Sequence, residues 1–158
     1  MSALELQAFL PQIILALGAT AVLMFGAWFP SRNWILGGVL VAVLAALSAA
    51  LIPPAVPEVA NLFSTGHYAR FFVVLWSLLG ALTLLLSLRY AEIHDLPGSE
   101  YAALILFALC GMTLLSSATS LLGLFLGLEA FTLVFYVLIA FKRDDSRGAE
   151  AGLKYLVM

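Results

Sequence analysis

The sequence predicts an all-α, polytopic transmembrane helix bundle, and three observations lead to this prediction. Of the 158 residues, 64% are hydrophobic and only 10% are charged, whereas soluble domains carry about 25% charged residues. The hydrophobic residues form long unbroken runs, while the strands of a transmembrane β-barrel would show short alternating segments. Lipid also offers no hydrogen-bond partner to an open backbone, so a long apolar run crosses the membrane as a helix.

A membrane span needs about 20 apolar residues, and five runs approach or reach that length. We predict spans at residues 8–29, 34–52, 71–88, 101–115 and 120–141. The short polar segment 116–119 between the last two is predicted to be a turn. A sixth helix is predicted from Ala149, and its ten residues to Met158 rise only about 15 Å, half the thickness of the hydrocarbon core. We therefore expect five spans and a truncated sixth.

The orientation follows from the positive-inside rule, because loops rich in Lys and Arg stay in the cytoplasm. With the N-terminus outside, the outer loops carry only Arg70. The inner loops then carry five basic residues, which are Arg32, Arg89, Lys142, Arg143 and Arg147. This excess predicts an outside N-terminus and a solvated cytoplasmic loop at 142–145. The first span is expected to stay in the mature protein, since it is longer than a signal-peptide core and no basic residue precedes it.

Several kinds of site are excluded by the residue types present. The single cysteine, Cys110, lies in an apolar run, so it forms no disulfide within the chain and is interpreted as a packing residue. His67 and His94 fall in predicted loops, whereas a haem between membrane helices needs histidines inside the spans. The sequence also has no basic patch of the kind that would indicate nucleic-acid binding. We expect no cofactor and no metal in this chain.

One carboxylate interrupts the fifth predicted span. In the stretch LFLGLEAFTLVF, residues 124–135, Glu129 is the single charged residue, and none other occurs between Ser120 and Phe141. A charge at mid-span costs about 2.5–3.5 kcal/mol on translocon scales, and ionisable residues inside membranes commonly mark ion or proton pathways. Glu129 is therefore a candidate proton carrier. The alternative is a protonated residue that hydrogen-bonds between helices without a transport role.

The helical repeat gives this span two different faces. At about 100° per residue, Thr132 and Tyr136 share the face of Glu129. Gly123 and Gly127 form a GxxxG pattern on nearly the opposite face, where they permit close helix packing. No Lys or Arg lies one turn from Glu129. A positive partner of Glu129 must therefore come from another helix.

Lys154 is the second candidate site residue. It follows Glu150 by four positions, which is the favourable order for an ion pair along a helix. It also lies close enough to the inner membrane boundary for its ammonium group to reach water. On these grounds the pair is interpreted first as structural, and as a possible point of proton access or charge coupling second.

The C-terminal part of the sequence resembles a known family. Residues 100–155, EYAALILFALCGMTLLSSATSLLGLFLGLEAFTLVFYVLIAFKRDDSRGAEAGLKY, look like the fourth to sixth helices of the antiporter-like membrane subunits of respiratory complex I. Residues 62–90, LFSTGHYARFFVVLWSLLGALTLLLSLRY, are similar to the third-helix region of the same family. Two of the sister subunits usually place Trp before the glutamate, whereas this chain has Leu128.

The resemblance implies a function and a set of partners. Residues 1–158 would be the N-terminal part of a proton-translocating domain in the bacterial inner membrane, beside other membrane subunits of the complex. Glu129 matches the family's fifth-helix glutamate, which pairs with a lysine on the seventh helix, and Lys154 matches a sixth-helix lysine. The resemblance also implies that NADH, flavin, iron–sulfur clusters and quinone belong to partner subunits. Because the family's inverted repeats extend beyond this sequence, the chain alone is not expected to pump protons.

Two other interpretations remain open. A multi-subunit cation/proton antiporter or a membrane-bound hydrogenase contains subunits of the same ancestry, so the chain could belong to either kind of complex. Alternatively, the chain is a truncated remnant with only a structural or assembly role.

Overall fold

The computed structural model describes residues 3–29, 31, 33–53, 56–94, 96–141 and 146–157. In these residues it has seven helices and one two-stranded hairpin. The helices are α1 (Ala3–Ala8), α2 (Leu10–Trp28), α3 (Trp34–Leu51), α4 (His67–Ile93), α5 (Gly98–Ser117), α6 (Leu121–Ile139) and α7 (Ser146–Val157). The strands are β1 (Glu58–Val59) and β2 (Phe63–Ser64), paired antiparallel. Five of the helices, α2 to α6, are long and apolar enough to cross a membrane.

The five predicted spans are confirmed as helices, and two of them are longer than predicted: α5 extends beyond 101–115 and α4 extends beyond 71–88, each at both ends. Helix α4 has 27 residues, which extend about 40 Å and exceed a hydrocarbon core of about 30 Å. Hydropathy marks where a helix leaves the lipid, whereas the helix itself continues until a residue stops it. Gly66 precedes the first turn of α4 and Pro97 follows its end, so polar residues such as Arg70 and Arg89 remain helical.

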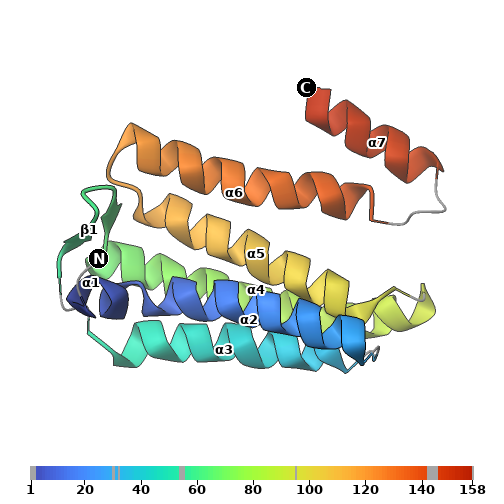
Figure 1. Cartoon of the computed structure of the whole chain (residues 1–158), viewed down its shortest axis with the longest axis horizontal. Coiled ribbons are helices and arrows are strands. Elements are labelled where there is room, and N and C mark those ends of the chain that lie inside the picture. Colours follow the sequence, from blue (N-terminus) through green and yellow to red (C-terminus); the bar gives the residue numbers. More distant parts are fainter. Residues whose placement is uncertain are drawn as a thin grey trace.

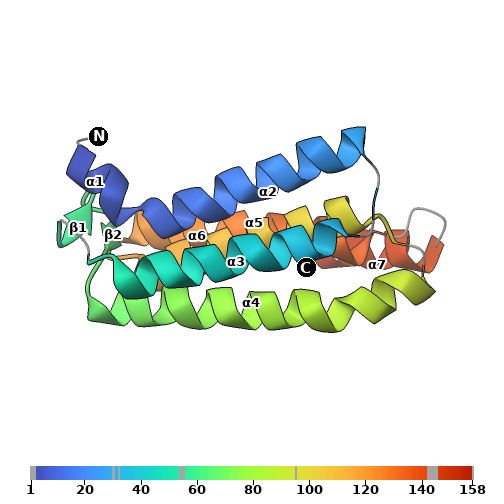
Figure 2. The same ribbon diagram turned by 90° about the horizontal axis from the view of Figure 1, so that it is seen from below.

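The spans form a layered bundle. Helices α2, α3, α4 and α5 pack side by side in alternating directions, α6 lies along α5, and α7 lies beside the far end of α6 (Figures 1 and 2). The core lies within the first four of these spans. Its largest fully buried apolar side chains are those of Leu15, Ile35, Leu84 and Leu106. Many core positions are Ala, and small residues let membrane helices approach closely.

Helices α5 and α6 meet at two glycines. A Cβ atom on Gly111 would lie 2.6 Å from the backbone nitrogen of Phe131, and one on Gly127 would lie 2.5 Å from that of Leu115. The predicted packing role of Gly127 is therefore confirmed. Gly123 is also buried, but it faces the hairpin, since its Cβ would lie 2.6 Å from the carbonyl oxygen of Leu62. Both glycines of α6 therefore lie in close contacts, Gly127 with α5 and Gly123 with the hairpin.

The hairpin was not predicted from the sequence. Its turn places Ala60 and Asn61 in the left-handed region, at φ 53° and 54°. The Leu62 amide donates to the Val59 carbonyl oxygen at 3.1 Å and closes the turn. Strands of two residues are too short to show an alternating pattern, and the turn lacks the glycine that usually marks such a hairpin.

The hairpin covers one end of the bundle, which we call the hairpin end. Phe63 is buried and makes an edge contact with Phe9, with ring centroids 5.5 Å apart. The Thr119 amide, in the α5–α6 connection, donates to the Leu62 carbonyl oxygen at 2.8 Å. Ser120 caps α6, because its hydroxyl accepts from the Gly123 amide at 3.1 Å. A connection between α5 and α6 is therefore present as predicted, but Ser116 and Ser117 belong to α5 and the connection covers residues 118–120. The hairpin holds this connection in place.

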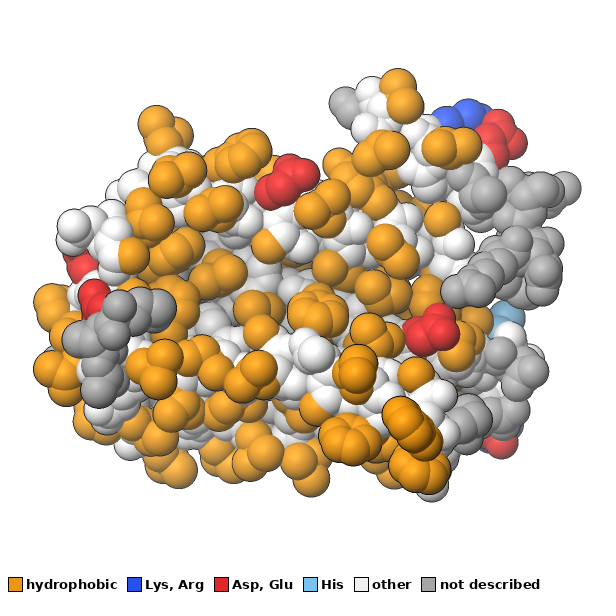
Figure 3. All heavy atoms as spheres, in the orientation of Figure 1, with side chains coloured by type: hydrophobic (Ala, Val, Ile, Leu, Met, Phe, Trp, Pro, Cys, Tyr) orange, Lys and Arg blue, Asp and Glu red, His pale blue; other side chains and the backbone are white. Residues whose placement is uncertain are grey.

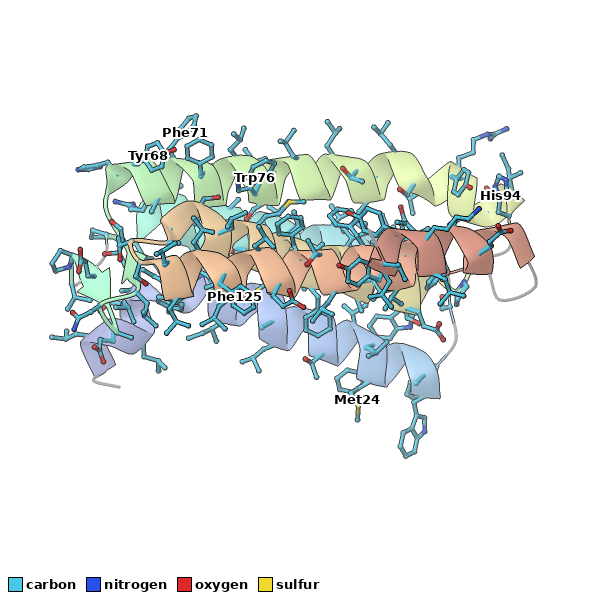
Figure 4. All side chains as sticks on the ribbon, turned by 90° about the horizontal axis from the view of Figure 1, so that it is seen from above. Met24, Tyr68, Phe71, Trp76, His94 and Phe125 are labelled. Carbon is cyan, nitrogen blue, oxygen red and sulfur yellow. The ribbon has the colours of Figure 1, made fainter. Side chains whose placement is uncertain are left out.

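The outer surface of the bundle is apolar. Hydrophobic side chains cover most of the face seen in Figure 3. Tyr68 and Phe71 lie at the hairpin end of α4 and point away from the bundle, and Met24 points away from α2 (Figure 4). Exposed aromatic residues near helix ends are typical of the interface between lipid and water. This surface is suited to lipid.

Replacing Gly127 with Ala is expected to separate α5 from α6. The added methyl group meets backbone atoms, which cannot rotate away, so we expect a loss of about 1–3 kcal/mol in unfolding free energy. The matched control is Gly37→Ala, whose Cβ would lie 3.5 Å from the nearest atom, in ordinary contact. The control should gain up to about 1 kcal/mol from helix propensity. Unfolding in detergent micelles measures the free energy of both variants. Equal effects of the two changes would contradict the close contact between α5 and α6.

Replacing Ala60 with Gly is expected to stabilise the hairpin. A non-glycine residue in the left-handed region costs about 1–2 kcal/mol, and glycine removes most of this cost. Unfolding free energy should therefore rise by about 1 kcal/mol. The control is Ala21→Gly, an exposed helical position of α2, where the same change should cost about 0.5–1 kcal/mol. A loss of unfolding free energy in both variants would show that Ala60 is not in the left-handed region.

Candidate functional site

Glu129 lies close to the middle of α6, the least buried of the five apolar spans. The buried residues of α6 are Gly123 and Gly127, and both lie on the face turned toward α5 and the hairpin. Glu129 is on nearly the opposite side and is half-buried. Its carboxylate has no hydrogen bond or ion pair with any part of the chain that the structure describes. The packing of one face of α6 therefore turns the carboxylate away from the bundle.

The two polar neighbours of Glu129 differ in what they can offer. The Thr132 hydroxyl donates to the Leu128 carbonyl oxygen at 2.9 Å, so its proton serves the helix backbone and only its oxygen can still accept. Tyr136 makes an edge contact with Tyr155 of α7, with ring centroids 5.2 Å apart. The predicted polar stripe thus runs from Glu129 past Thr132 and reaches α7 at Tyr136.

Helix α7 carries the second candidate site, the pair Glu150 and Lys154. The Lys154 ammonium nitrogen lies 2.6 Å from a carboxylate oxygen of Glu150, which confirms the predicted ion pair. Both side chains are about two-thirds exposed, at 68% and 65%. Gly152 lies against α6, since its Cβ would lie 2.9 Å from that of Ala140. In the described residues no hydrogen bond or ion pair connects this pair to Glu129, so the structure does not bring the two candidate sites together.

Other predicted residues have simpler places. The Cys110 thiol contacts the Gln12 carbonyl oxygen at 3.7 Å, so this residue packs α5 against α2, as predicted. Arg32 and the run 142–145 lie outside the described residues. Among the residues that are described, no three His, Cys, Asp or Glu side chains lie close enough to hold a metal ion.

Sequence reasoning missed a set of buried polar residues in the first four spans. The Trp76 indole nitrogen donates to the Ser116 hydroxyl oxygen at 2.8 Å and joins α4 to α5. Gln12 and Ser77 are both buried, and each has a side-chain oxygen without a hydrogen-bond partner in the part of the chain that the structure describes. The available signal was a polar residue inside a predicted span, which is the same signal that identified Glu129.

Known proteins match the C-terminal region of the chain and also nearly its whole length. The family model described as NADH:quinone oxidoreductase/Mrp antiporter, TM, matches residues 118–158. The chain is 48% identical over 154 residues to NADH-quinone oxidoreductase subunit N of Syntrophotalea carbinolica, covering 96% of this chain and 32% of that protein. It is 43% identical over 160 residues to the same subunit of Geobacter metallireducens, covering 100% of this chain and 34% of that protein. The chain spans about a third of the length of these relatives.

The five apolar spans and the matched region define a multi-pass, antiporter-like membrane protein of the bacterial inner membrane. Within this class, the chain is similar to bacterial NADH-quinone oxidoreductase subunit N over about a third of that subunit's length. The family resemblance predicted from the sequence is confirmed. The matched region 118–158 contains Glu129, Glu150 and Lys154.

Replacing Lys154 with Gln is expected to change stability very little. An exposed ion pair between residues four apart on a helix contributes about 0.2–0.5 kcal/mol, and salt screens it. Unfolding free energy in detergent should fall by less than about 0.5 kcal/mol, and the difference should shrink at high salt. Glu150→Gln is the matched control and should behave in the same way. A loss several times larger would show that Lys154 has a partner besides Glu150.

Proposed function

We propose that the chain is the N-terminal part of a proton-translocating membrane domain of NADH:quinone oxidoreductase, with Glu129 as the proton-carrying carboxylate. One observation carries the proposal: Glu129 is an ionisable residue near the middle of α6 without a hydrogen-bond or ion-pair partner in the described residues. Its position inside the region matched by the family model supports the proposal. The names of the relatives support the kind of complex in which it would act.

The chemistry of Glu129 follows from its surroundings. A carboxylate within a membrane is costly unless it is neutral or paired. In the described residues nothing pairs with Glu129, so it either carries a proton as the neutral acid or faces a cation from another segment or subunit. Exchange between these two states takes up or releases one proton. The half-buried position leaves one side of the carboxyl group open to such a partner.

Glu150 and Lys154 are proposed to tune proton access from the cytoplasmic side. They lie on α7, which touches α6 at the Tyr136–Tyr155 contact. Tyr136 is seven residues from Glu129, or about 10.5 Å along the helix. The exposed ion pair could therefore change the potential at one end of the polar stripe without contacting Glu129.

The energy for transport is proposed to come from partner subunits. NADH oxidation, flavin, iron–sulfur clusters and quinone chemistry would belong to those subunits, and this chain would contribute the membrane part. On this proposal the chain does not pump protons alone, because a cationic partner for Glu129 has to come from elsewhere in the assembly.

A second candidate is a subunit of a cation/proton antiporter. The description of the matching family model names Mrp antiporters beside NADH:quinone oxidoreductase, which is the observation that favours it. A carboxylate at mid-span can exchange a proton for a metal cation as well as carry a proton. The two candidates differ in the ion that moves and in the need for NADH.

Glu129→Gln tests the proposal in membranes that hold the assembled complex. The amide keeps the size of the side chain but cannot release a proton, so NADH-driven proton pumping should fall by about 100-fold or more, the range for loss of a proton-transfer group. Glu129→Asp should restore part of the pumping. The control is Glu58→Gln, an exposed carboxylate of the hairpin, which should leave pumping unchanged.

The outcomes separate the candidates. Unchanged pumping in Glu129→Gln, with normal assembly, would favour a structural role and overturn the proposal. Loss of sodium–proton exchange that does not depend on NADH would favour the antiporter instead. The amount of assembled complex, measured on native gels, distinguishes loss of transport from loss of the complex.

A further inference from the structure

A small, partly open cavity lies at the hairpin end, where α2, α3, α4 and α5 meet α1 and the hairpin. The volume open to the centres of water molecules is about 30 Å³, and one water needs about 10–15 Å³. Among the residues around it are four polar side chains from four different segments: Gln12, Ser48, Thr65 and Ser117. Arg70 also lines the cavity. The space is polar and large enough for one or two waters, but it is too small for a lipid chain.

Among the residues around this cavity, Gln12 has a buried hydrogen-bond acceptor that lacks a donor in the described residues. The residue is 8% exposed, and its amide oxygen is buried without a hydrogen-bond partner among the described residues. A buried acceptor left unpaired costs about 1–3 kcal/mol, and most such groups in proteins are paired with protein or ordered water. A donor is therefore required at the Gln12 oxygen.

Three of the neighbouring hydroxyl groups already donate their protons elsewhere. The Ser48 hydroxyl donates to the Ala45 carbonyl oxygen at 2.8 Å, and that of Ser117 donates to the Thr113 carbonyl oxygen at 2.7 Å. The Thr65 hydroxyl also donates to a backbone carbonyl oxygen, that of Val56. Each hydroxyl then presents only lone pairs to the cavity. The wall is rich in acceptors, which suits a molecule with two donors.

Arg70 decides the charge of the cavity. Its Nε and Nη2 atoms donate to the Ala49 carbonyl oxygen at 3.0 and 2.8 Å, and Nη2 donates to that of Ala50 at 3.2 Å. These bonds hold the guanidinium group at the C-terminal end of α3, where a positive charge is favourable. A metal cation among the same acceptors would be repelled by this charge. Water satisfies the acceptors without that repulsion.

We propose that this cavity is a water-binding site in which one or two ordered waters join the Gln12 amide oxygen to Ser117 and Arg70. The water donates one hydrogen to Gln12 and one to the Ser117 oxygen, and it accepts from a guanidinium N–H that no backbone carbonyl uses. A water with about three hydrogen bonds is typical of buried sites.

The site would connect the ends of four spans. Arg70 already joins α4 to α3 through the Ala49 and Ala50 carbonyl oxygens. The water extends this connection to α2 through Gln12 and to α5 through Ser117. Because lipid supplies no hydrogen bonds, an internal water is the available way to satisfy these groups at the membrane boundary. This inference does not depend on the proposed role of Glu129.

A structure of the assembled complex at a resolution that shows ordered water tests the site directly. We expect density at about 2.7–3.2 Å from the Gln12 amide oxygen, within reach of Ser117 and Arg70. An empty cavity, a protein donor bonded directly to Gln12, or an ion at metal–ligand distance would each overturn the proposal.

Gln12→Leu tests the same site through stability, in the full chain within its complex. If water satisfies the amide, the change removes real hydrogen bonds, and the unfolding midpoint of the chain should fall by about 2–4 °C. If the amide oxygen is truly unpaired, leucine removes a buried unsatisfied group and the midpoint should rise, which would contradict the proposal. The matched control is Ser77→Ala, because Ser77 is also buried and has no hydrogen-bond partner among the described residues, but it does not line the cavity. Its midpoint should stay the same or rise.

Discussion

Close approach of helix backbones at small residues is the constraint on which the rest of this structure depends. In lipid no hydrophobic effect drives helices together, so association relies on packing and on hydrogen bonds between them. Gly111 and Gly127 bring α5 and α6 together until added methyl groups would meet backbone atoms. Gly38 lets α3 approach α5 closely as well, since its Cβ would lie 3.0 Å from the Ala102 side chain. These contacts fix how each helix is rotated about its own axis.

The rotation of α6 determines what Glu129 can do. With both glycines of the GxxxG pattern turned inward, the carboxylate can only face away from the first four spans. The hairpin strengthens this arrangement, because the Leu62 carbonyl oxygen lies against Gly123 and accepts from the Thr119 amide at the start of α6. A packing feature at one end of the molecule therefore sets the direction of the candidate site at the middle of the membrane.

Polar groups in the bundle fall into two kinds. Most hydroxyls donate to a carbonyl oxygen of their own helix, as Thr132 and Ser117 do, so they cost little in lipid and carry no signal of function. Glu129 and Gln12 are different, because neither has a side-chain partner in the described residues. One faces away from the bundle and the other faces an internal cavity. Their directions lead to different proposals, a proton carrier and a water site.

Much of the fold was predictable because membrane helices follow local rules. Apolar run length located the five spans, and helical spacing predicted the glycine face of α6 and the Glu150–Lys154 pair. The length of α4 was predicted wrongly, because hydropathy reports the lipid boundary and not the end of the helix. The short helix α1 and the hairpin were missed, since neither has enough residues for a periodic pattern.

The sequence by itself determined the class of protein, the spans and the charge at mid-span, because each depends on composition or on residues close together along the chain. Tertiary structure decided which polar groups share a cavity, since Gln12, Arg70 and Ser117 are far apart in sequence and meet only where four helix ends converge. It also decided that Gly123 packs against the hairpin while Gly127 packs against α5. Such choices depend on the relative rotation of packed helices, which no local pattern contains.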